Sequence, residues 1–184
     1  MMGSYTDRIS LVFEPTIDRG LPKPALYRDL TASLAALLEG ETDALANLAN
    51  AAALLSGALE RINWCGFYLM REGELVLGPF QGKPACVRIA LGKGVCGTAA
   101  ARRETLVVPD VHAFPGHISC DAHSHSEIVV PIVVDRALRG ILDVDSPETD
   151  RFDAEDRAGL EAFVAALSPR IDWKDFEKVA RAVG

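Results

Sequence analysis

The change in sequence pattern at Ile62 restricts the fold more than any other feature of this chain. Before it, residues 24–39 and 41–60 carry apolar side chains at helical spacing, with Gly40 as a natural stop between them. After it, the chain breaks into short β-type runs separated by turns that contain glycine. Two helices are therefore expected first, followed by an antiparallel sheet.

The remaining segments complete a sheet of about six strands. We predict a helix over residues 92–104, an amphipathic helix with an acidic first turn over residues 153–168, and a last helical segment over residues 173–183. The turn of the final hairpin is predicted at residues 136–139. The predicted strands are residues 62–70, 74–80, 85–91, 105–111, 127–135 and 139–146. The expected fold class is α+β, with a central antiparallel sheet flanked by helices.

Composition is typical of a globular protein with one domain. The 184 residues are 49% apolar and 24% charged, and we expect residues 24–184 to form a single domain after an N-terminal extension, residues 1–23. No apolar run approaches the roughly 18 residues of a membrane span, and the N-terminus lacks an apolar secretory segment. A net charge of −7 without a basic cluster argues against nucleic acid as a partner. We expect a cytoplasmic protein.

Three of the four cysteines lie in loop-like sequence beside glycine, lysine or histidine. They are Cys86 in KPACV, Cys96 in GKGVCGTA and Cys120 in GHISCDAHSHSE. Reactive cysteines need a partly open, electropositive or helix-capped setting that favours the thiolate, so thiol chemistry is the first hypothesis. Packing remains the alternative for Cys86 and for Cys96, which stands at a predicted helix start. Cys65 lies in a strand that looks buried, where core filling is expected.

The loop over residues 110–126 contains all four histidines and Cys120. A loop of this length in a compact domain is more often functional than not. Its histidines and Cys120 are of the types that bind zinc, but their spacing matches no common zinc signature, so we expect no metal. The residues weighed for that site are His112, His117, Cys120, His123 and His125.

Acidic and aromatic side chains share strand faces near this loop. Asp143 and Asp145 have the same parity in an otherwise apolar strand, and Glu127 begins the strand before it. Two acids on one face repel, which raises a pKa or binds a cation unless that face is simply solvated. Trp64 and Tyr68 also share parity, as core residues or as a pocket wall.

Long segments of the chain strongly resemble the free methionine-(R)-sulfoxide reductases, which are single GAF-domain enzymes. The resemblance is carried by NWCGFYL, by GILDVDSP, and by the stretch from LVLGPFQGKPAC through GKGVCG and HISCDAHSHSEIVVPI, and it extends over about residues 27–167. A GAF-like fold is therefore expected. The alternatives are a GAF sensor, whose cyclic-nucleotide signature is echoed only at Phe152 and Asp156, and a thiol redox sensor.

The resemblance also implies a role for each motif residue. Cys120 would attack the sulfoxide sulfur, Cys86 would resolve the resulting sulfenic acid as a disulfide, and Cys96 would be a third cysteine of less clear role. Thioredoxin or another dithiol would reduce the enzyme, with no further cofactor. Exposed helices are compatible with a homodimer. The implied pocket residues are the acids Glu127, Asp143 and Asp145 and the aromatics Trp64 and Tyr68.

Overall fold

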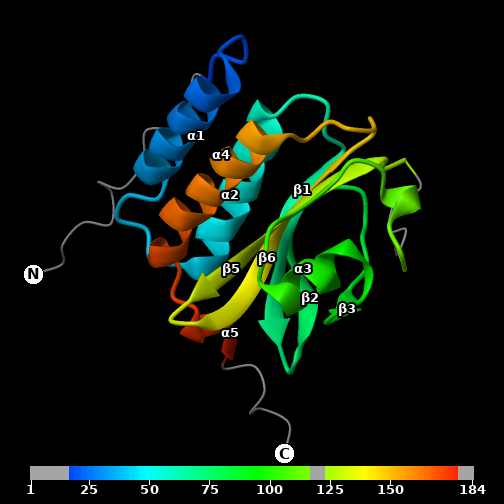
Figure 1. Cartoon of the computed structure of the whole chain (residues 1–184). Coiled ribbons are helices and arrows are strands. Elements are labelled where there is room, and N and C mark those ends of the chain that lie inside the picture. Colours follow the sequence, from blue (N-terminus) through cyan, green and yellow to red (C-terminus); the bar gives the residue numbers. More distant parts are fainter. Residues whose placement is uncertain (1–16, 117–122, 178–184) are drawn as a thin grey trace, which may run out of the picture.

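The computed structural model describes residues 17–116 and 123–177. Its centre is a six-stranded sheet in the order β3-β2-β1-β6-β5-β4, in which every neighbouring pair is antiparallel (Figure 1). The predicted α+β class and the number of strands are confirmed. The strands are β1 Trp64–Arg71, β2 Glu74–Gly82, β3 Arg88–Ala90, β4 Leu106–Val108, β5 Ser126–Val134 and β6 Ala137–Ser146.

Helices cover the two faces of the sheet unequally. Helices α1 (Lys23–Leu37), α2 (Ala44–Ala58) and α4 (Ala154–Leu167) pack over one face and enclose the larger apolar core (Figure 1). The short α3 (Gly94–Arg102) packs on the other face over a second core. A final helix, α5, spans Lys174–Glu177. No helix in the described residues is long and apolar enough to cross a membrane.

Strand parity assigns the side chains of β1 to these two cores. Cys65 and Phe67 face the large helical core, whereas Trp64 and Tyr68 face α3. This alternation follows from the two-residue period of a strand. The expectation that Cys65 fills the core is confirmed, because its side chain is fully buried there.

Buried Asp156 connects the ends of α1 and α4. Its carboxylate accepts a hydrogen bond of 2.8 Å from the Tyr27 hydroxyl and pairs with Arg151 at 3.2 Å. It also completes a capping box with Asp153, the N-cap of α4. The helix therefore begins at Ala154, one residue after the predicted start. Asp156 therefore has a structural role in the α1–α4 contact.

The predicted hairpin turn was placed too late in the chain. The turn between β5 and β6 consists of Asp135 and Arg136, both with positive φ, as a two-residue hairpin of this twist requires. Neither residue is the glycine or asparagine that usually indicates such a turn, so the sequence offered no clear signal. The predicted strand over residues 85–91 is likewise shorter, and residues 178–183 of the last predicted helix lie outside the described residues.

Gly159 is required where α4 meets α1. A Cβ atom at this position would lie 2.1 Å from the buried ring of Tyr27, which its bond to Asp156 holds in place. We expect Gly159→Ala to lower the free energy of unfolding by about 1–3 kcal/mol, as overpacking does. Chemical denaturation would measure this loss.

A glycine in α2 supplies the matched control. Gly57 is exposed, and a Cβ there meets no heavy atom within 4 Å. Gly57→Ala should therefore raise stability by up to about 1 kcal/mol, because alanine restricts the unfolded chain. Equal effects of the two substitutions would contradict the tight α1–α4 contact.

Candidate active site

A cavity opens on the α3 face of the sheet, away from the three large helices. Six of the predicted site residues line it, and they come from four different elements. They are Trp64 and Tyr68 of β1, Cys96 of α3, Glu127 of β5, and Asp143 and Asp145 of β6. The structure therefore brings together residues that lie up to 81 positions apart in sequence (64 to 145).

The strand register explains how the polar residues meet. Asp145 is paired with Trp64 on one side and with Glu127 on the other, so these three side chains form a row across β1, β6 and β5. Paired residues in antiparallel strands project from the same face. Asp143 lies two residues before Asp145 and shares that face, as its parity predicted.

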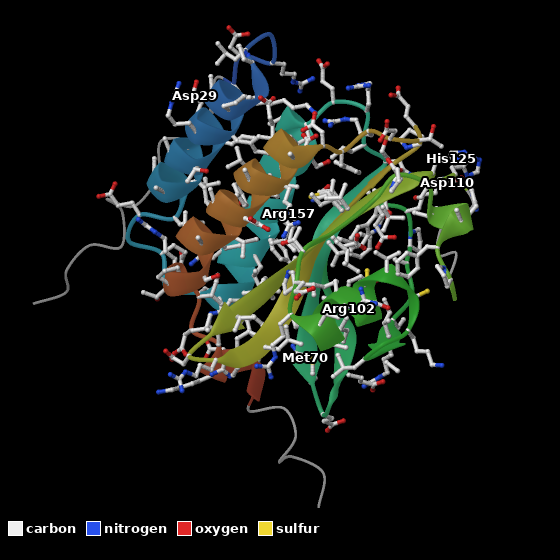
Figure 2. The ribbon with its side chains drawn as sticks, in the orientation of Figure 1. Asp29, Met70, Arg102, Asp110, His125 and Arg157 are labelled. Atoms are coloured by element: carbon white, nitrogen blue, oxygen red, sulfur yellow. The ribbon has the colours of Figure 1, made fainter. Side chains whose placement is uncertain are left out.

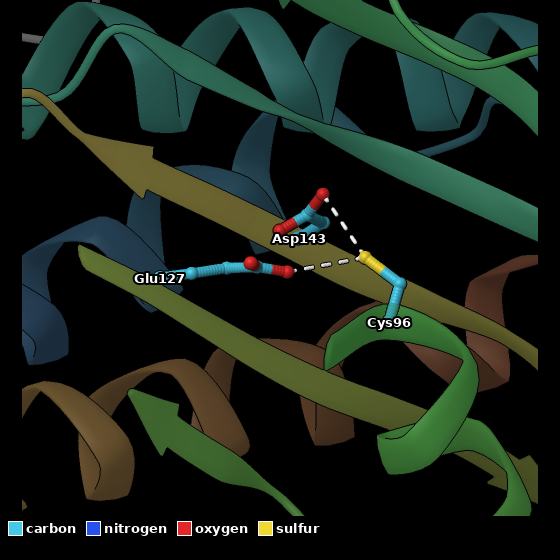
Figure 3. Close-up of side chains that lie close together, drawn as sticks. All are labelled: Cys96, Glu127 and Asp143. Atoms are coloured by element: carbon cyan, nitrogen blue, oxygen red, sulfur yellow. Dashed lines mark hydrogen bonds between the residues drawn. The ribbon is translucent and has the colours of Figure 1, made fainter. Parts of the chain in front are cut away.

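Cys96 lies at the centre of the acidic group. Its Sγ is 3.2 Å from Glu127 Oε1 and 3.3 Å from Asp143 Oδ2, with a hydrogen bond to each carboxyl (Figure 3). The three side chains are almost fully buried, with 7%, 6% and 5% exposure for Cys96, Glu127 and Asp143. The third cysteine thus has direct contact with the acids.

Burial makes these acids unusually weak. Desolvation, with a smaller contribution from the charge of Asp145, raises the pKa of Glu127 to about 8. Desolvation and the neighbouring charge of Glu127 also raise the pKa of Asp143 well above its ordinary value. The carboxyl of Glu127 therefore holds its proton at neutral pH, inside a cavity that a ligand can enter.

The same surroundings disfavour a thiolate at Cys96. Burial, together with the charges of Asp143 and Glu127, raises the pKa of this thiol well above its ordinary value. Cys96 lies in the first turn of α3, yet desolvation outweighs any stabilisation from the helix N-terminus.

Contacts with neighbouring residues fix the position of Trp64 in the cavity wall. The ring of Trp64 stacks on Tyr68 with centroids 5.9 Å apart and on Phe80 with centroids 5.3 Å apart. Its indole N–H donates to the Lys83 carbonyl at 3.1 Å. Gly82 has a φ of 136°, and a Cβ there would lie 2.5 Å from the indole ring. Only glycine lets this loop close over Trp64.

Polar residues that sequence reasoning missed complete the lining. Lys83, Lys93 and Ser124 all face the cavity, and the Lys83 ammonium lies 3.3 Å from His123 Nδ1. The Ser124 hydroxyl accepts a hydrogen bond from the Asn63 side chain at 3.1 Å. Lys83 and Lys93 lie within the GKPAC and GKGVCG motifs, so their place beside the motif cysteines was the signal that could have identified them.

The described histidines lie beside the cavity but do not line it. His112 and His125 contact each other edge to face, with ring centroids 5.2 Å apart. Figure 2 shows Asp110 and His125 near each other at one end of the sheet, where the Val111 amide donates to the His125 carbonyl at 2.9 Å. His117 and Cys120 lie outside the described residues.

The described cysteines differ in their oxidation state. Cys65 and Cys96 are free thiols, whereas Cys86 is half-buried and disulfide-bonded. Cys86 follows the loop of Lys83, Pro84 and Ala85, and all three of these residues line the cavity. Cys86 therefore lies next to the cavity.

Known proteins match nearly the whole of this domain. The GAF domain family matches residues 33–171. The free methionine-R-sulfoxide reductase of Escherichia coli (strain K12) is 52% identical over 161 residues, which cover 88% of this chain and 98% of that protein. The chain belongs to the free methionine-R-sulfoxide reductase family. The family that the motifs indicated is thereby confirmed.

Solved structures of similar proteins share this fold. The free methionine-R-sulfoxide reductase from Neisseria meningitidis in complex with its substrate has a TM-score of 0.80 at 44% identity, covering 85% of this chain and 94% of that one. A putative GAF sensor protein from Burkholderia vietnamiensis has a TM-score of 0.81 at 57% identity, covering 84% of this chain and 98% of that one. Both matches confirm the expected GAF-like fold.

Proposed function

We propose that this protein reduces free L-methionine (R)-sulfoxide to L-methionine with a cysteine thiolate. The observation that carries the proposal is a buried carboxyl, Glu127, whose pKa burial raises to about 8, in a cavity walled by Trp64 and Tyr68. A sulfoxide oxygen leaves only when it is protonated, and a carboxylic acid with a pKa near 8 supplies a proton at neutral pH. Membership of the reductase family supports the same substrate.

The thiol chemistry follows the roles that the motifs imply. The Cys120 thiolate attacks the sulfoxide sulfur while Glu127, with Asp143 or Asp145 beside it, protonates the oxygen. The sulfoxide S–O bond breaks as its protonated oxygen is transferred to the Cys120 sulfur, so methionine leaves and Cys120 becomes a sulfenic acid. The Cys86 thiol then displaces that oxygen as water and forms a disulfide with Cys120. The disulfide-bonded state of Cys86, beside two free thiols, supports this step.

A dithiol protein such as thioredoxin would complete the cycle. One of its thiolates attacks the disulfide and forms a mixed disulfide. Its second thiol then breaks that mixed disulfide, so the dithiol protein is oxidised to a disulfide and both enzyme cysteines are reduced. Cys86 is half-buried rather than enclosed, which supports this exchange at Cys86.

Recognition of the free amino acid follows from the polar lining. Asp145 is less buried than the other two acids and faces the same cavity, so we assign it to the substrate's α-ammonium. Lys83 and Lys93 provide cations for the α-carboxylate. A peptide-linked methionine sulfoxide lacks both charges. The flat face of Trp64 packs on the S-methyl group and so discriminates between the two epimers.

A cyclic-nucleotide sensor fits the structure less well. Asp156, one of the two residues that echoed its signature, is bonded to Tyr27 and Arg151. Phe152, the other, is buried in the large core beneath the Arg151 guanidinium. Neither residue lines the cavity.

Incubation of the reduced protein with each sulfoxide epimer, free and peptide-bound, tests the proposal. We expect stoichiometric methionine release and loss of two thiols with the free (R) epimer alone. Oxidation of the thiols by peroxide, without methionine from any sulfoxide, would contradict the reductase and support a redox sensor.

A further inference from the structure

The acidic group around Cys96 has the arrangement of a metal-binding site. Cys96 Sγ and one carboxylate oxygen each of Glu127 and Asp143 lie within 4.8 Å of one another, and all three residues are buried. These side chains come from α3, β5 and β6, so the rigid sheet and the helix packed on it hold their spacing (Figure 3). No other group of this kind occurs among the described residues.

The distances suit zinc. With a zinc–sulfur bond of about 2.3 Å and zinc–oxygen bonds of about 2.0 Å, the observed sulfur–oxygen separations of 3.2 and 3.3 Å correspond to angles of about 95–100°. Those angles need only a small adjustment to become tetrahedral. A thiolate among the ligands favours borderline-soft Zn²⁺ over Mg²⁺ or Ca²⁺, which prefer sets of oxygen ligands.

A second observation points to a ligand at the same place. The Asp143 side chain is 95% buried (5% exposed), and its Oδ1 has no hydrogen-bond partner in the described part of the chain. The residue lines the cavity that Cys96 and Glu127 also line. Buried carboxylate oxygens are rarely left unpartnered, and a cation that Asp143 binds through both Oδ2 and Oδ1 would satisfy this one.

We propose that the reduced protein binds Zn²⁺ in this cavity through the Cys96 thiolate and the carboxylates of Glu127 and Asp143. Three protein ligands leave the fourth tetrahedral position open to water. The metal would occupy the same cavity that the proposed substrate enters. Zn²⁺ is therefore a reversible inhibitor that competes with methionine sulfoxide. This inhibition, unlike the binding of Zn²⁺ itself, rests on the proposed function.

Cobalt is the probe for the site, because Zn²⁺ is spectroscopically silent. Co²⁺ added to the reduced full-length protein should give a thiolate-to-cobalt charge-transfer band and the intense visible bands of a tetrahedral site, and Zn²⁺ should displace it. Cys96→Ser should abolish the charge-transfer band and weaken Co²⁺ binding by at least about 100-fold, since loss of even an outer-shell partner costs 10–100-fold.

Cys86→Ser is the matched control. It removes another thiol near the cavity but leaves the proposed ligands in place, so the cobalt spectrum should persist. An unchanged charge-transfer band in Cys96→Ser would overturn the proposal, as would loss of the band in Cys86→Ser.

A second variant keeps the proposal testable if Cys96→Ser does not fold. Asp143→Asn retains the thiol but removes a carboxylate ligand, and it should weaken Co²⁺ binding by at least about 10-fold. Unchanged affinity in this variant would also overturn the site. Cobalt binding is measured without substrate, so its failure is distinguishable from a failure of methionine release.

Discussion

Cys120→Ser should abolish methionine release from free methionine-(R)-sulfoxide, lowering the rate by about 10³-fold or more. A serine hydroxyl is far less nucleophilic than a thiolate at neutral pH, and the attack on sulfur has no other source in the proposed mechanism. Chromatographic measurement of methionine in a single turnover of the reduced variant would test this. Normal turnover by Cys120→Ser would refute the assignment.

Two other cysteines serve as controls for this experiment. Cys65 is buried in the core on the opposite face of the sheet, so Cys65→Ala should keep the single-turnover rate and lose only some stability. Cys86→Ser should release methionine once but form no disulfide, leaving a sulfenic acid that a sulfenic-acid reagent traps. If all three variants lost methionine release in the first turnover equally, the substitutions would be disturbing the fold rather than removing a catalytic thiol.

Glu127→Gln should lower kcat/KM by about 10²–10⁴-fold, the usual contribution of general acid catalysis. Glutamine fits the same space but cannot supply the proton. The wild-type protein should lose activity as the pH rises through about 8, because the acid is effective only while it is protonated. A profile of kcat/KM against pH should fall above about pH 8 in the wild type, and this fall should be absent in the variant.

The same substitution should make the protein more stable at alkaline pH. The pKa of Glu127 is raised from 4.5 to about 8 on folding, so between these values the folded state keeps a proton that the unfolded state has lost. Stability therefore falls as the pH rises across this range, by about 1.4 kcal/mol for each pKa unit at most. A neutral glutamine avoids this loss, and we expect a gain of a few kcal/mol at pH 8 in chemical denaturation.

The combination of lower activity and higher stability separates catalysis from misfolding. Glu161 on α4 offers a control, because it is exposed and paired with Arg157 away from the cavity. Glu161→Gln should leave both kcat/KM and its pH dependence unchanged. If Glu127→Gln lost activity and stability together, Glu127 would be a structural residue instead.

Much of the fold could be predicted from local patterns. Helical spacing before Ile62 and alternation after it predicted the α+β class and the number of strands. The shared parity of Trp64 and Tyr68, and of Asp143 and Asp145, correctly predicted pairs that face the same way. The turn at Asp135 and Arg136 was missed, because Asp135 is not followed by the glycine that usually completes such a turn and arginine does not favour a positive φ.

The sequence by itself determined which residues alternate, which motifs carry the family, and therefore which side chains are available for chemistry. Only the tertiary structure decided that Cys96 contacts Glu127 and Asp143, that Lys83 and Lys93 join their cavity, and that Trp64 stacks on Phe80. Local periodicity arises from backbone geometry within one segment. Contacts between strands depend on register and helix docking, and a pKa depends on how completely those contacts exclude water.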